Sequence, residues 1–148
     1  MFKLSAVRIT YTFMPLTYHH GTWLVSKLVP YFVDQCYQTS ECRFVDYMNF
    51  CFEKQEIMLA STGKSQNELI SLWVNLTAES LNIDPQPLAD VFTDADAHNS
   101  EMRTRTMWKY AVSRSVSGTP SVFVNGVLLE NNPFTAQGWL DLVQELYD

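Results

Sequence analysis

The chain has 148 residues, of which 47% are apolar and 18% are charged, and this size and composition fit one folded domain and exclude a disordered protein. The net charge of -6 argues against nucleic acid as a partner, because phosphate binding needs clustered Lys and Arg. No apolar run approaches the roughly 18 residues of a membrane span, so none is expected.

The first predicted element is a strand over residues 4–14. Val7, Ile9, Tyr11 and Phe13 alternate with less apolar residues, which is the period-two pattern of a strand with one apolar face. This alternation differs from the continuous apolar core of a signal peptide. We therefore find no export signal in the given chain and take a cytoplasmic location as the default.

Helices are predicted over the next hundred residues. Their expected ranges are 22–38, 41–60, 65–81 and 88–92, followed by a long helix that ends near residue 117. Pro30 should kink or split the first of them, because proline removes one intrahelical hydrogen-bond donor. Ser65 followed by Glu68 is the capping-box pattern, which predicts a helix start.

A hairpin and a final helix complete the predicted order. The strands are expected at 121–125 and 127–130, since Asn125-Gly126 is a strong two-residue turn signal. Pro120 stands at the mouth of the first strand, where a proline marks a bulge, an edge or a cis peptide. Thr135 is expected to cap the last helix, whose predicted inward face consists of Trp139, Leu140, Val143, Leu146 and Tyr147.

Two segments resemble the DsbA-like thioredoxin-fold family. FMPLTYHHGTWLVSK is similar to the strand-to-helix segment of that family, and RTMWKYAVSRSVSGTPSVFVNGV is similar to its last long helix and cis-proline loop. The resemblance implies a thioredoxin-like α/β fold in one domain over 1–148, with a helical insertion at about 41–95. It also implies a cis Thr119–Pro120 bond, with Thr119 and Pro120 aligning an extended substrate strand.

The chain departs from the family pattern at its front. In the family a strand and a helix with Cys-x-x-Cys precede the strand placed here at 4–14, and this chain has three residues before Leu4. We therefore expect a truncated domain without the N-terminal βα unit, redox-inactive as given. Loss in this lineage and an incomplete gene sequence both stay open.

The three cysteines, Cys36, Cys42 and Cys51, match no known metal-binding spacing. Free thiols are the expected state, and a disulfide between Cys36 and Cys42 is the alternative. The carboxylate of Glu41 opposes thiolate formation at Cys42, and no second cysteine completes a Cys-x-x-Cys there. A catalytic cysteine is therefore not predicted.

Two groups of polar residues are candidates for a metal site or an acid/base site. They are His19, His20 and His98 with an Asp, and Asp94, Asp96 and Glu101. Consecutive imidazoles diverge, so we interpret the histidine pair as a cap for the following helix and expect no metal and no cofactor. We interpret the carboxylates as favourable charge at a helix N-terminus.

Three functions stay open from the sequence. The first is a relative, or a part, of a thiol–disulfide oxidoreductase whose thiol motif is absent from this chain. The second is a non-catalytic module that holds an extended peptide or a protein client along the Pro120 edge. The third is a glutathione-binding relative of the kappa-type transferases, which rests on the resemblance alone. The sequence does not predict the oligomeric state.

Overall fold

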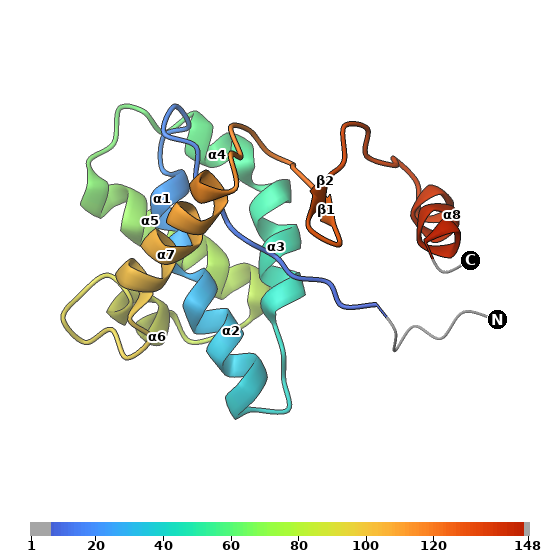
Figure 1. The fold of residues 1–148 in the computed structure, drawn as a ribbon. Coiled ribbons are helices and arrows are strands. Elements are labelled where there is room, and N and C mark those ends of the chain that lie inside the picture. Colours follow the sequence, from blue (N-terminus) through green and yellow to red (C-terminus); the bar gives the residue numbers. More distant parts are fainter. Residues whose placement is uncertain (1–6, 147–148) are drawn as a thin grey trace. The chain divides into compact units, whose positions relative to one another are not determined.

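The computed structural model describes residues 7–146 and divides the chain into two compact units (Figure 1). The helical unit is Thr12–Ser115. The hairpin unit is formed by Met1–Tyr11 and Val116–Asp148, of which 7–11 and 116–146 are described. Each unit is considered by itself below.

The helical unit contains seven α-helices among its residues. They are α1 (Thr22–Lys27), α2 (Val29–Gln38), α3 (Phe44–Glu53), α4 (Gln55–Leu59), α5 (Gln66–Leu81), α6 (Pro85–Asp90) and α7 (Ser100–Ser113). The predicted split of the first helix at Pro30 is confirmed, because α1 ends at Lys27 and Pro30 occupies the first turn of α2. The predicted helix over 41–60 is instead two helices, which meet at Lys54.

The start of α5 follows the sequence signal closely. The backbone N–H of Glu68 donates to the Ser65 hydroxyl oxygen at 3.4 Å, and the Ser65 N–H donates to the Glu68 carboxylate at 2.8 Å. This capping box satisfies two donors that the first helical turn leaves without partners. The predicted third helix is thereby confirmed over Gln66–Leu81. The expected short helix at 88–92 lies three residues earlier, where Asp84 caps Pro85–Asp90.

The core of the helical unit is organised around the hydroxyl of Tyr47. That hydroxyl donates to the carbonyl oxygen of Val25 at 2.6 Å and accepts from Nε1 of Trp73 at 3.1 Å. Tyr47 and Trp73 are almost fully buried, and the Tyr47 ring stacks on Phe32 with 4.3 Å between centroids. One side chain of α3 therefore joins α1, α2 and α5 in a core where every polar atom of this contact has a partner.

The hairpin unit contains a two-stranded antiparallel sheet and one helix within its described part. Strands β1 (Phe123–Val124) and β2 (Val127–Leu128) pair with Phe123 opposite Leu128 and Val124 opposite Val127. Asn125 and Gly126 both have positive φ, of 50° and 86°, which is the requirement of the tight turn predicted from their sequence. Helix α8 (Ala136–Glu145) begins after Thr135, whose hydroxyl accepts from the Gly138 N–H at 3.1 Å, as predicted.

The strand predicted at 4–14 is wrong over its described part. Residues 7–14 form no strand, and residues 4–6 lie outside the described residues. Ile9 and Tyr11 are 71% and 53% exposed. An alternating pattern favours a strand only where a neighbouring strand supplies hydrogen-bond partners. No such pairing is made by residues 7–14 in the structure.

The inward face predicted for the last helix is only partly formed in the described residues. None of the residues of α8, Ala136–Glu145, is buried: Trp139 and Val143 are half-buried, whereas Leu140 and Leu146 are 50% and 53% exposed. Tyr147 lies outside the described residues. The apolar face of α8 therefore stays in partial contact with solvent.

None of the helices within residues 7–146 combines the length and the apolar character that crossing a membrane requires.

Replacement of Tyr47 tests the central contact of the helical unit. Tyr47→Phe keeps the ring but leaves the Val25 carbonyl and the Trp73 N–H without their partner, so we expect a loss of about 1–3 kcal/mol in the free energy of unfolding. Chemical denaturation measures it. Tyr37→Phe is the matched control, because Tyr37 is 86% exposed. Equal stability of the two variants would show that the Tyr47 hydroxyl does not hold these helices together.

Candidate functional site

The segment predicted to bind a substrate strand lies at the entrance to the hairpin. Thr119, Pro120 and Ser121 are exposed, and the Thr119–Pro120 peptide bond is cis. The Ser121 hydroxyl donates to the Gly118 carbonyl at 2.6 Å, and the Leu129 N–H donates to the Val122 carbonyl at 2.9 Å. The segment therefore leads directly into a two-stranded sheet, which is too small to bury its own apolar residues.

Large apolar side chains are exposed along the described hairpin unit. They include Val127 (67%), Leu128 (50%), Phe134 (102%), Leu140 (50%) and Leu146 (53%). Soluble monomers rarely leave so much apolar surface in contact with water unless it serves an interaction. Residues 116–148 also contain four acidic residues and no Lys, Arg or His. This part of the chain is thus both apolar and acidic.

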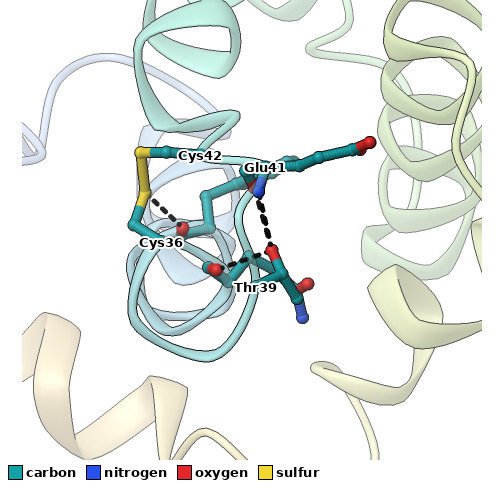
Figure 2. Close-up of a disulfide and its surroundings, with 6 residues drawn as sticks. Cys36, Thr39, Glu41 and Cys42 are labelled. Carbon is teal, nitrogen blue, oxygen red and sulfur yellow. Dashed lines mark hydrogen bonds between the residues drawn. A yellow bond between two sulfur atoms is a disulfide. The ribbon is translucent and has the colours of Figure 1, made fainter.

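No thiol accompanies the Pro120 segment in sequence or in its own unit. All three cysteines lie within Thr12–Ser115, the helical unit. Cys36 and Cys42 are joined by a disulfide, the alternative to the free thiols expected for them, and Cys51 is a free cysteine (Figure 2). The bond closes a loop between the last turn of α2 and the residues before α3.

Cys51 is a half-buried thiol that packs against the helical core. Burial raises the pKa of Cys51 to about 12, and a hydrogen bond to Tyr47 opposes this only in part. A thiol with such a pKa is protonated at neutral pH, and the thiolate is the form that reacts. Cys51 is therefore a packing residue.

A cluster that the sequence did not predict joins α2 to α7 and the loop before it. The carboxylate of Asp34 accepts from Nη1 of Arg103 at 2.8 Å and lies 2.8 Å from Nδ1 of His98. Burial alone would raise the pKa of Asp34, but the hydrogen bonds from His98 and Arg103 and their charges lower it overall. Asp34 is 64 and 69 residues from His98 and Arg103 in the sequence, so no local pattern predicts this cluster.

Two of the three carboxylates considered as acid/base candidates, Asp96 and Glu101, have structural roles. The third, Asp94, is exposed. Asp96 accepts from the Ser100 N–H at 2.6 Å, which places it at the start of α7. Glu101 accepts from Arg105 at 2.8 Å and from Nε1 of Trp23 at 3.1 Å, and these contacts help to lower its pKa. Asp96 and Glu101 therefore stabilise the first turn of α7, in line with the sequence interpretation.

The histidine pair does not cap α1 with a side chain, so that interpretation is wrong. The residue before α1 is Gly21, with φ of 79°, and no side chain caps the helix there. The carbonyl of His19 accepts from the Thr22 hydroxyl at 2.9 Å instead. In the part of the chain that the structure describes, no three His, Cys, Asp or Glu residues are grouped as a metal site requires.

Comparisons with known proteins found no matching family model, no similar curated protein and no similar solved structure.

The lowered pKa of Asp34 predicts an acid-sensitive contribution to stability. The charged carboxylate is favoured in the folded state, so it stabilises the fold above its ordinary pKa of 3.8 and the stabilisation is lost as the pH falls through the lower folded value. Urea unfolding from about pH 6 to about pH 2 should show this loss, and Asp34→Asn should flatten it.

The control for Asp34 is Glu79→Gln, which changes an exposed carboxylate of α5. In this variant the free energy of unfolding should fall with decreasing pH as it does in the unmodified chain. An unchanged low-pH loss of unfolding free energy in Asp34→Asn would contradict the role assigned to the cluster of Asp34, His98 and Arg103.

The reactivity of Cys51 gives a second prediction. With Cys36 and Cys42 oxidised, alkylation of the native chain by iodoacetamide at pH 7 should be at least about a thousandfold slower than in urea, because a pKa of about 12 leaves almost no thiolate. Mass spectrometry follows the modification. Similar rates in the folded and unfolded chain would refute a buried, inert Cys51.

Proposed function

We propose that this chain is a redox-silent relative of the DsbA-like thioredoxin-fold proteins, and that its hairpin unit binds an extended polypeptide by strand addition beside Thr119–Ser121. The observation that carries the proposal is the unfilled apolar surface of the described hairpin unit, where no residue of α8 is buried. The order of elements from α7 through the hairpin to α8 supports the family resemblance.

Strand addition suits this unit for a physical reason. A two-stranded sheet presents backbone groups at its outer edges, and an added strand supplies partners for them while covering adjacent apolar side chains. Pro120 and Ser121 are exposed and continue without a break into Val122 and β1. A client segment can therefore run alongside this stretch of backbone.

The chemistry of the client follows from the composition of residues 116–148, the part of the hairpin unit that contains the proposed edge. These residues hold Glu130, Asp141, Glu145 and Asp148 and no basic residue, while the other part of the unit, residues 1–11, holds Lys3 and Arg8. Complementary charge favours a partner with Lys or Arg beside apolar residues, and it also speeds the encounter. We therefore propose a client that is extended, apolar on alternate residues and basic at its ends.

Binding, rather than thiol chemistry, is proposed for this unit because it holds no cysteine. All of Cys36, Cys42 and Cys51 belong to the helical unit. The hairpin unit supplies no sulfur of its own, so we propose that replacement of all three cysteines by serine leaves client binding unchanged.

A fluorescent peptide of alternating Val and Thr with Lys at both ends tests the proposal. We expect the full chain to bind it, with affinity that falls as salt is added. The same peptide with alternate residues N-methylated should bind at least about tenfold more weakly, because it has lost the donors of a strand ladder. Fluorescence anisotropy measures both.

Two controls locate the contact and exclude self-association. A photocrosslinking residue in place of Ser121 should capture the peptide, whereas one in place of Phe52, exposed on α3, should not. Equal binding of the N-methylated peptide, or capture at position 52 alone, would overturn strand addition. A stable dimer in light scattering that the peptide does not dissociate would assign the edge to a second copy instead.

A further inference from the structure

We infer that the Cys36–Cys42 disulfide is a thiol–disulfide exchange site for low-molecular-weight thiols, with Cys42 as the sulfur that forms the mixed disulfide. This site belongs to the helical unit, whereas the proposed client surface belongs to the hairpin unit. Its support comes from the different exposure of the two cysteines and from the position of Cys36 against a backbone carbonyl.

The two cysteines differ in their exposure to solvent. Cys42 is exposed in the loop before α3, whereas Cys36 is half-buried in the last turn of α2. Exposed disulfides exchange with thiols far more readily than enclosed ones, and the accessible sulfur is the one attacked. The bond closes a short loop, with a sequence separation of 6 between the cysteines, so it constrains the unfolded chain less than a long-range disulfide would.

Cys42 stands at the start of a helix. It lies two residues before Phe44, the first residue of α3, and no side chain caps that helix start. The positive end of the helix dipole favours a negative sulfur, while the carboxylates of Glu41 and Asp46 oppose it. The Arg43 guanidinium is bonded elsewhere, since it donates to the Leu81 carbonyl at 3.1 Å. Glu41 is the more exposed partner of a loose pair with Arg43, at 4.0 Å, so water screens it.

Cys36 has the opposite environment, which fits a resolving thiol. Its Sγ lies 3.3 Å from the carbonyl oxygen of Phe32, one turn back along α2 (Figure 2). A disulfide sulfur carries no hydrogen, so only the reduced Cys36 thiol can donate to this carbonyl. The hydrogen bond and the negative end of the α2 dipole both favour the protonated thiol at Cys36.

Complete reduction of the disulfide by exchange consumes two molecules of thiol. A thiolate attacks Sγ of Cys42, forms a mixed disulfide with it and releases Sγ of Cys36, which takes a proton. A second thiolate then attacks the outer sulfur of the mixed disulfide and releases the Cys42 thiolate. Two thiols are oxidised to one disulfide while the protein disulfide is reduced to a dithiol, and the reverse sequence restores it.

Thr39 shapes the loop that the disulfide closes. Its hydroxyl donates to the Gln35 carbonyl at 2.9 Å and accepts from the Glu41 N–H at 3.2 Å (Figure 2). A cavity of about 340 Å³ lies beside this loop, but neither Cys36 nor Cys42 is among its lining residues.

The test equilibrates the full chain with mixtures of reduced and oxidised glutathione and traps free thiols with a maleimide for mass spectrometry. We expect Cys36 and Cys42 to pass reversibly between disulfide and dithiol across these mixtures without unfolding. In Cys36→Ser the glutathione adduct should form on Cys42 at least tenfold faster than it forms on Cys36 in Cys42→Ser.

A charge variant that keeps both cysteines separates a reactive site from a merely structural bond. Glu41→Gln should speed alkylation of reduced Cys42 a fewfold, because it removes an opposing carboxylate, with circular dichroism confirming the fold. A disulfide that stays oxidised in excess reduced glutathione until the chain unfolds would overturn the inference. Equal adduct rates on the two cysteines, or no effect of Glu41→Gln, would do the same.

Discussion

The helical unit depends on one buried hydroxyl. Tyr47 extends from α3 into the core, where it donates to the backbone of α1 and accepts from Trp73 of α5. A buried polar group without a partner costs free energy, so this contact is formed only when the helices take one arrangement. The helical unit therefore has a buried core formed by its own residues. Its two exceptional features, the exposed disulfide and the Asp34 cluster, lie toward its surface.

The hairpin unit lacks a comparable centre within its described residues. Its sheet has two short strands, and α8 contributes an apolar face but no buried residue. Small sheets reach independent stability by adding strands or by packing against a helix. The same deficit explains why an extended client is the proposed ligand, because an added strand supplies both hydrogen bonds and apolar cover.

Local signals in the sequence predicted the start of a helix, a helix break and a turn, whereas contacts between distant residues could not be predicted. The capping box at Ser65, the split at Pro30 and the Asn125-Gly126 turn were predictable because each is decided by a few neighbouring residues. The strand expected at 4–14 failed over 7–14, since a strand also needs a neighbour. Asp34, His98 and Arg103 meet across more than sixty residues, which no spacing rule anticipates. Of the candidate site, Thr119 and Pro120 came from the family resemblance alone.

Hydrogen–deuterium exchange with and without the basic, alternating peptide tests whether the hairpin edge binds an added strand. Amide exchange reports backbone hydrogen bonds residue by residue. We expect slower exchange for residues 119–129 when the peptide is bound, with the amides of α3 and α5 unchanged. Protection confined to the helical unit, or no protection in the hairpin at saturating peptide, would contradict it.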